Sequence, residues 1–272
     1  RFLVWNFLAN KLWTFRLKER NIAIPEKFEH DLSIIVPAYN EENRIRNTLL
    51  IVNDYLKEKR INAEIIVVSD GSKDKTVEIV EALKHKISNL KTVDLVKNQG
   101  KGAAVKAGIE SSNGTYILFT DADNSTPIDE YEKLNRKLHE HNAQIAIGSR
   151  YLHDSNVKIK QPKYRILLGR IGNILIRIFL IDDIKDTQCG FKLFTHKAAK
   201  EIFSFQKVKR FGFDMEALVI AENLNLRIVE VPVSWFNSAE SRFRPLKDAL
   251  ITLKDLIYIK LNLMCGRYNL DK

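Results

Sequence analysis

Two carboxylates separated by a single residue, Asp121 and Asp123, follow a short apolar run at residues 116–119. The run is rich in β-favouring residues and predicts a buried strand. In extended backbone, residues i and i+2 point the same way, so both carboxylates would leave one face of the strand end. Two such oxygen ligands suit a Mg²⁺ or Mn²⁺ ion that also holds phosphates. An Asp-x-Asp pair is expected about once by chance in a chain of this length, so its surroundings decide its meaning.

Polar clusters also follow three earlier predicted strands, near residues 34–36, 64–69 and 91–96. They are Tyr39-Asn40-Glu41, Asp70-Gly71-Ser72 and Asn98-Gln99-Gly100-Lys101-Gly102. The strands alternate with predicted helices and are apolar throughout, which predicts a mostly parallel sheet covered on both faces. Ligands of such sheets bind at the carboxyl ends of the strands. Four polar clusters at four predicted strand ends are much harder to obtain by chance than one.

The glycine-containing loop before the helix predicted at 100–111 matches neither of the common phosphate-binding fingerprints. It is not a Walker A loop, because Gly102 follows Lys101 where that loop has Ser or Thr. It is not the dinucleotide fingerprint either, because Val105 occupies the position of the third small residue. The small residues could still let a diphosphate approach, with Lys101 supplying charge. A nucleoside diphosphate bound there would be a substrate rather than a fixed cofactor.

The composition favours a globular protein with an anionic partner. The 272 residues carry a formal net charge of +10, which is typical of proteins that meet nucleic acid, a membrane surface or phosphorylated substrates. Cys189 and Cys265 form no disulfide or zinc spacing, so a reducing compartment is expected. No run of about 18 uncharged apolar residues occurs. The sequence begins at Arg1 without a Met, and whether an upstream segment such as a membrane anchor has been removed stays open.

Three segments have the composition of membrane-interface helices. Residues 1–20 mix aromatic and cationic side chains, and docking on the protein's own core is the alternative. Residues 163–181 are apolar but carry basic side chains on one helical face, and the alternative is a buried helix with solvated arginines. Residues 245–264 predict a long helix whose apolar face contains Leu246, Leu250, Leu253, Ile257, Leu261 and Met264.

Other segments of the second half predict ordinary elements. Residues 128–141 predict a helix, residues 144–148, 186–194 and 227–233 predict strands, and residue 212 opens a further helix. Asp214 and Glu216 fall in the first turn of that helix, where negatively charged side chains interact favourably with the helix dipole.

Several motifs, in matching order over residues 30–262, carry a family resemblance. They are Val-Pro-Ala-Tyr-Asn-Glu-Glu (36–42), Val-Ser-Asp-Gly-Ser-Lys-Asp (68–74), Asn-Gln-Gly-Lys-Gly (98–102), Asp-Ala-Asp-Asn-Ser-Thr-Pro (121–127), Gly-Ser-Arg (148–150), Asp-Thr-Gln-Cys-Gly-Phe-Lys-Leu-Phe (186–194), Gly-Phe-Asp-Met-Glu (212–216) and Pro-Leu-Lys-Asp-Ala-Leu (245–250). The chain resembles family 2 glycosyltransferases of GT-A fold, and most closely the dolichyl-phosphate β-glucosyltransferases. The resemblance implies an α/β, Rossmann-like fold with a mostly parallel central sheet flanked by helices.

The resemblance also implies a division of the chain. Residues 1–30 would form an interfacial or anchor-proximal helix and linker. Residues 31–240 would form the catalytic domain, with a nucleotide-sugar half at 31–150 and an acceptor half at 151–240. Residues 241–272 would contain a C-terminal amphipathic helix.

The family pattern assigns roles to individual positions. It implies that the donor is held by Pro37, Ala38, Tyr39, Glu41, Asp70, Gly71, Lys101, Asp121, Ala122, Asp123 and Gln188. It implies that Asp121 and Asp123 bind Mg²⁺ or Mn²⁺, and that the acceptor phosphate meets Arg150, Lys160, Arg165 and Arg170. Asp123, Asp214 and Arg150 are expected to carry catalysis, with Asp214 near the sugar. Related mannosyl transferases often have Gln two residues after the Asp-x-Asp pair. Ser125 stands there, which favours the glucosyl branch and leaves the third metal ligand open.

The implied reaction is an inverting, metal-dependent transfer of glucose from UDP-glucose to dolichyl or another polyprenyl phosphate, which gives a β-linked product. Alternatives within the family are another donor, such as GDP-mannose, and a soluble or glycan acceptor. A nucleotidyltransferase could share the sheet and the metal carboxylates, whereas no nucleic-acid-binding motif supports a nucleic-acid partner. The enzyme is expected at a membrane surface on the cytoplasmic side, of the endoplasmic reticulum in a eukaryote or of the plasma membrane in a prokaryote. Oligomeric state stays open.

Overall fold

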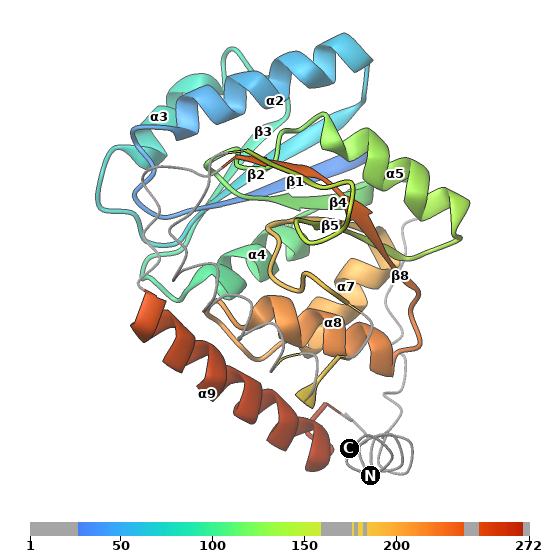
Figure 1. Cartoon of the computed structure of the whole chain (residues 1–272). Coiled ribbons are helices and arrows are strands. Elements are labelled where there is room, and N and C mark those ends of the chain that lie inside the picture. Colours follow the sequence, from blue (N-terminus) through green and yellow to red (C-terminus); the bar gives the residue numbers. More distant parts are fainter. Residues whose placement is uncertain (1–26, 159–175, 177–178, 182–183, 237–244, 269–272) are drawn as a thin grey trace.

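A seven-stranded sheet forms the centre of the molecule, in the order β3-β2-β1-β4-β7-β5-β8 (Figure 1). The computed structural model describes residues 27–158, 176, 179–181, 184–236 and 245–268. The sheet strands are β1 (His30–Ala38), β2 (Ala63–Ser69), β3 (Leu90–Asp94), β4 (Gly114–Thr120), β5 (Ile145–Ser149), β7 (Phe191–Thr195) and β8 (Ile228–Pro232). β6 (Asn156–Lys158) and β9 (Ser234–Phe236) form a separate parallel pair. Both halves of the predicted catalytic domain contribute strands to the main sheet.

Helices cover both faces of this sheet (Figure 1). α2 (Ile45–Lys59), α3 (Thr76–Leu83) and α5 (Glu130–Glu140) lie on one face, and α4 (Lys101–Glu110), α7 (His196–Phe205) and α8 (Phe213–Asn223) lie on the other. α9 (Pro245–Met264) packs outside this second layer and adds Leu256 and Ile259 to its core.

The apolar strand runs feed two separate cores. In β1, Ile34 and Val36 join the core under α2, α3 and α5, whereas Ile35 joins the core under α4, α7 and α8. Successive strand side chains point to opposite faces, so a strand buried on both faces needs apolar residues at every position. The predicted fold class is therefore confirmed.

One strand departs from the parallel arrangement. β7 lies between β4 and β5 and runs antiparallel to both. The sequence predicts strand-like structure over 186–194, but the strand begins only at Phe191 and leads directly into α7, which was not predicted. Thr195 caps this helix by accepting a hydrogen bond from the Ala198 amide (3.4 Å).

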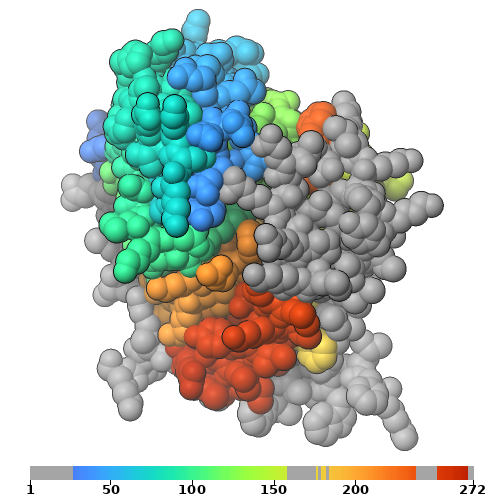
Figure 2. Space-filling view, turned by 90° about the vertical axis from the view of Figure 1, so that its left-hand side faces the viewer, coloured from blue at the N-terminus to red at the C-terminus, as the bar shows by residue number. Residues whose placement is uncertain are grey.

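α9 has the predicted boundaries and leaves much of its apolar face uncovered. Leu250, Leu253, Ile257, Leu261 and Met264 are 42–69% exposed. Figure 2 shows this helix in red on the surface, beside the orange residues of the acceptor half. Among the described residues, none of the helices is both long enough and apolar enough to cross a membrane.

Several predictions fall on the undescribed part of the chain. The helix at 1–20, most of the helix at 163–181, and the acceptor-phosphate candidates Lys160, Arg165 and Arg170 lie outside the described residues.

Candidate active site

The polar clusters predicted at the strand ends meet at one edge of the sheet. β1 is parallel to both β2 and β4 and lies between them, so residues 39–41, 70–72 and 121–123 follow neighbouring carboxyl ends. The Asp70 amide donates to the Ala38 carbonyl (2.8 Å), which joins two of these ends directly. Pro37 and Ala38 close β1, and the next residue, Tyr39, is 36% exposed.

The Asp70 carboxylate holds the loop that precedes α4. Its Oδ1 accepts from the Gln99 amide (2.7 Å) and its Oδ2 accepts from the Gly100 amide (2.8 Å), while the side chain is buried. Gly71 has a φ of +67°, and a Cβ there would lie 2.7 Å from the Asn98 nitrogen. Asp70 and Gly71 therefore fix the position of the loop that precedes α4. Donor contact by Asp70 and Gly71 stays a prediction.

The two glycines flanking Lys101 have a packing role that the sequence did not reveal. Gly100 has a φ of +111°, and a Cβ there would lie 2.5 Å from the Lys209 carbonyl oxygen. A Cβ on Gly102 would lie 2.6 Å from Cβ of Phe213. These contacts require glycine because the 206–213 segment approaches the start of α4 closely.

Lys101, the first residue of α4, pairs with the first aspartate of the Asp-x-Asp motif. Its Nζ lies 2.5 Å from Oδ1 of Asp121 and 5.1 Å from the centre of the Phe119 ring. Burial alone would lower the pKa of Lys101, but the carboxylates of Asp121 and Asp214 raise it above the ordinary lysine value. The amine therefore carries a positive charge at neutral pH.

Gly190 is a site residue that sequence reasoning did not select. A Cβ at this position would lie 2.0 Å from Oδ2 of Asp121, so only glycine leaves room for the carboxylate. Its place beside Phe191 within the Asp-Thr-Gln-Cys-Gly-Phe motif was the available signal. Gln188, two residues earlier, is exposed.

Asp123 has a different set of neighbours. Its Oδ1 accepts from the Ser125 amide (3.0 Å), and its Oδ2 lies 4.0 Å from Nη1 of Arg44. Arg44 is itself held by Glu41, whose Oε1 accepts from Nη2 at 2.9 Å and whose Oε2 accepts from Nε. The carbonyl of the intervening Ala122 accepts from the Thr48 hydroxyl (2.7 Å). Arg44 was missed because only its spacing from Glu41 suggested it.

The two aspartates suit a cation shared with a bound ligand. Asp121 is 34% exposed and Asp123 is 21% exposed, so both carboxylates reach solvent. In the described part of the chain, no three His, Cys, Asp or Glu side chains converge as metal ligands. The two open carboxylates fit Mg²⁺ or Mn²⁺, which are commonly bound through one or two carboxylates together with substrate phosphates.

Asp214 lies behind these carboxylates, at the start of α8. Its Oδ1 is 2.5 Å from Nζ of Lys192, a fully buried lysine that also donates to the Cys189 carbonyl (2.5 Å). Burial raises the pKa of Asp214, although Lys192 and Lys101 oppose that rise. Asp214 is 4% exposed, which suits support of the Lys101–Asp121 pair better than proton transfer to a substrate. Lys192 gave no recognisable signal in the sequence.

Glu216 lies two residues after Asp214 in α8, and its carboxylate also has hydrogen-bond partners outside that helix. Its carboxylate accepts from the amides of Lys207 and Val208 and from the Tyr268 hydroxyl (2.6 Å). It therefore ties the 206–213 segment to the C-terminal end of the described chain.

Arg150 follows β5 and is gripped by Asp186. Nε donates to Oδ2 (2.8 Å), Nη2 donates to Oδ1 (2.9 Å), and the Arg150 amide donates to Oδ2 (2.9 Å). The guanidinium carbon lies 5.5 Å from the Trp235 ring centre. Trp235 precedes Phe236, whose amide donates to the Ser125 carbonyl (2.8 Å). Ser125 thus connects the Asp123 carboxylate to the strand that carries Trp235 beside Arg150.

Comparison with known proteins gives consistent matches. The model of the family described as glycosyl transferase family 2 matches residues 33–203. A dolichyl-phosphate β-glucosyltransferase of Drosophila melanogaster is 36% identical over 252 residues, which span 88% of this chain and 77% of the relative. One of Dictyostelium discoideum is 37% identical and covers 86% and 75% of the two chains.

Solved structures match the fold. The glucosyl-3-phosphoglycerate synthase of Mycobacterium tuberculosis, crystallised with Mn²⁺, UDP-glucose and phosphoglyceric acid, aligns with a TM-score of 0.63 at 20% identity. The match covers 88% of this chain and 80% of the synthase.

Proposed function

The chain belongs to glycosyl transferase family 2, and we propose that this glycosyltransferase moves glucose from UDP-glucose to a polyprenyl phosphate such as dolichyl phosphate. The observation that carries the proposal is the pair of open carboxylates, Asp121 and Asp123, beside the cationic Lys101 at the start of α4. The relatives named dolichyl-phosphate β-glucosyltransferases support the sugar and the acceptor.

The donor half would bind the UDP diphosphate. Asp121 and Asp123 would hold a Mg²⁺ or Mn²⁺ ion, which when bound neutralises charge on the leaving diphosphate. Lys101 adds a fixed positive charge at the helix N-terminus, where anions are already favoured. The mycobacterial synthase binds Mn²⁺ and UDP-glucose on the same fold, which supports this use of the site.

The acceptor half would bring a second anion into line with the sugar. Arg150 presents a guanidinium that a carboxylate holds on one side, and arginine binds phosphate well through its remaining donors. A phosphate monoester is already anionic near pH 7, with a second pKa of about 6. The nucleophile therefore needs little help from a base, which agrees with a buried and paired Asp214. A single in-line displacement would invert the anomeric centre and give the β-linked product.

We further propose that α9 rests on the membrane that contains the lipid acceptor. Leu250, Ile257 and Leu261 are 51–69% exposed on one helical face, and the neighbouring Lys254 is also exposed. An apolar face with basic edges is the usual form of an interfacial helix. The net charge of +10 favours an anionic lipid surface. Location on the cytoplasmic side stays a prediction.

Labelled UDP-glucose, dolichyl phosphate in detergent and Mg²⁺ or Mn²⁺ provide the direct test. We expect labelled glucose in the lipid fraction and its loss after EDTA treatment. Parallel reactions with GDP-mannose as donor and phosphoglyceric acid as acceptor test the alternatives. Transfer to the soluble acceptor without any lipid-linked glucose would overturn the proposal.

Vesicle binding tests the role of α9 separately. Replacing Ile257 and Leu261 together by Glu should reduce binding to anionic vesicles by at least about 10-fold, because two apolar side chains leave the lipid. Replacing Asn47 and Ile51 together by Glu is the matched control, since both side chains are exposed on α2, in the opposite helical layer, and the same number of glutamates is added. Equal loss in the two proteins would remove α9 from the membrane contact.

A further inference from the structure

The Arg150 guanidinium is fixed by one side only. The Asp186 carboxylate accepts hydrogen bonds from Nε and Nη2 of Arg150 in a side-on pair, and it also accepts from the Arg150 amide. Arginine has five N–H donors in a rigid fork, so this geometry leaves Nη1 for another anion. Arg150 is 23% exposed, whereas Asp186 is 2% exposed. The arginine therefore faces solvent and the aspartate acts from behind it.

Asp186 is not part of a helix or a strand, so something else must hold it in place. Glu230 does so from β8. Its Oε2 accepts from the Lys185 amide (2.9 Å) and its Oε1 accepts from the Asp186 amide (2.8 Å). Both carboxylate oxygens of Glu230 therefore hold the backbone that presents Asp186.

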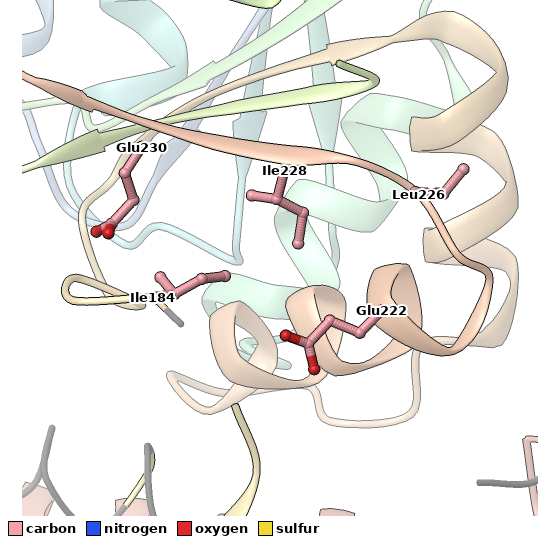
Figure 3. Close-up of a pocket in the computed structure, with 5 residues that line it drawn as sticks. All are labelled: Ile184, Glu222, Leu226, Ile228 and Glu230. Carbon is pink, nitrogen blue, oxygen red and sulfur yellow. The ribbon is translucent and has the colours of Figure 1, made fainter. Parts of the chain in front are cut away.

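The sheet register explains why this contact forms. β5 and β8 are parallel neighbours, with Ile147 opposite Glu230 and Ser149 opposite Pro232. Glu230 thus lies three residues before Arg150 in the paired register, within reach of the segment behind it. Figure 3 shows the Glu230 side chain extending from β8 toward the segment that carries Ile184. It does so at the wall of an open pocket of about 270 Å³, which Glu222 lines from α8.

We propose that Glu230 is a positioning residue for the acceptor phosphate. It holds the Lys185–Asp186 backbone, Asp186 holds the Arg150 guanidinium, and Arg150 presents Nη1 to the phosphate of the polyprenyl phosphate. This inference rests on the proposed function, because it takes Arg150 as the residue that meets the acceptor. It adds two contacts between residues that are distant in sequence. Glu230 and Asp186 are 44 residues apart, and Asp186 and Arg150 are 36 residues apart.

The testing variant is Glu230→Gln, which keeps the size of the side chain but replaces one acceptor oxygen by an NH₂ group. Loss of one charge-assisted hydrogen bond corresponds to about a 10-fold effect. We expect the KM for dolichyl phosphate to rise about 10-fold, with kcat and the KM for UDP-glucose changed less than about 2-fold. Glu222→Gln is the matched control, because Glu222 lines the same pocket but does not accept from those two amides.

A double-mutant cycle separates positioning from a merely structural effect. If Glu230 acts through Arg150, Glu230→Gln should change the acceptor KM little once Arg150→Ala is present. Full additivity of the two changes, equal rises in donor and acceptor KM, or an unchanged acceptor KM would each overturn the inference.

A measurement that needs no turnover distinguishes failure of the inference from failure of the proposed function. The Nε–H proton of Arg150 in the full chain, assigned by its loss in Arg150→Lys, should exchange with solvent faster in Glu230→Gln than in Glu222→Gln. Unchanged exchange would show that Glu230 does not hold the arginine. If exchange is faster but Arg150→Ala leaves the acceptor KM unchanged, the link from Glu230 to Arg150 stands. What fails in that case is the acceptor role of Arg150, which comes from the proposed function.

Discussion

Two cation–carboxylate pairs stand at strand ends in this protein, and they are built in opposite ways. In the Lys101–Asp121 pair both side chains reach solvent, with exposures of 23% and 34%. In the Arg150–Asp186 pair only the arginine does, because Asp186 is 2% exposed and receives three hydrogen bonds from Arg150. The first pair offers both charges to a ligand, whereas the second offers only its cation.

The difference matches the ligands that we propose for the two pairs. A site that holds a diphosphate through a metal needs open carboxylates, since a metal coordinates their oxygens directly. A site that holds a phosphate without a metal needs a cation at a fixed position and a carboxylate kept away from the incoming anion. Asp214 is buried and paired with Lys192. It therefore resembles Asp186, which is also a buried carboxylate that holds a cation, and differs from the open Asp121 and Asp123.

The largest effect is expected from an open carboxylate. Asp123→Asn should lower turnover about 10³-fold, because it removes a charge that acts directly on the bound ligands. The side chain is partly exposed, and the one hydrogen bond that it accepts from a described residue is the local bond from the Ser125 amide, so the thermal midpoint should change little. Lipid-linked glucose formation and a melting curve measure the two quantities. Metal-dependent activity that survives the substitution would remove Asp123 from the metal site.

A buried carboxylate should respond in stability instead. Lys192→Met leaves Asp214 unpaired in the interior and should lower the free energy of unfolding by about 3 kcal/mol. The folded-state pKa of Asp214 is already raised by burial, so its carboxyl is tolerated best when protonated. Stability contributed by a raised carboxyl pKa is present below the unfolded value of about 3.9 and is lost as pH rises through the folded value.

Urea unfolding of Lys192→Met and the unchanged protein measures this difference. The destabilisation should be smaller at pH 4.5 than at pH 7.5. A pH-independent loss would mean that Asp214 is not the group left without its partner.

Gly190→Ala tests the open pair through its packing. The new Cβ would lie 2.0 Å from Oδ2 of Asp121, so the carboxylate must move. Displacement of a reacting group by about 1 Å can cost about 10²-fold in rate. Steady-state assays should show that loss in kcat, while far-UV circular dichroism confirms the fold. Activity within 2-fold of the unchanged protein would show that the position of Asp121 is not critical.

The sequence predicts the open pair better than the buried ones. Asp121, Asp123 and Lys101 follow local signals, namely an apolar run and a glycine-containing loop. The partners of the buried carboxylates depend on contacts between distant segments, such as Lys192 with Asp214 across 22 residues. No local pattern encodes those contacts, because they exist only once β7 enters the sheet antiparallel to β4 and β5.

The glycines show the same limit of local reasoning. The sequence predicts that Gly100 and Gly102 let a phosphate approach, and the structure gives a second reason why they lack a side chain, namely the close approach of Lys209 and Phe213. The fold class was predictable, since continuous apolar strands alternate with helices. The orientation of β7 was not, because an apolar strand has no directional signature.

Glu216 is a third kind of carboxylate, and it provides the smallest expected effect. It is buried, and the described groups that donate to it are the Lys207 and Val208 amides and the Tyr268 hydroxyl, none of which is a cation. Burial raises the pKa of Glu216 against the effect of these donors.

Tyr268→Phe removes one donor and keeps the ring, so the free energy of unfolding should fall by about 1–2 kcal/mol. Urea unfolding at pH 7.5 would measure the loss, with an unchanged dependence on urea concentration. The amides still satisfy the carboxylate, and the affected segment lies beside α4 rather than beside Arg150. The acceptor KM should therefore stay constant. A change in that KM as large as that of Glu230→Gln would mean that Glu216, on the side of α4, and Glu230, behind Arg150, act on one shared site, and the contrast between the two cation–carboxylate pairs would disappear.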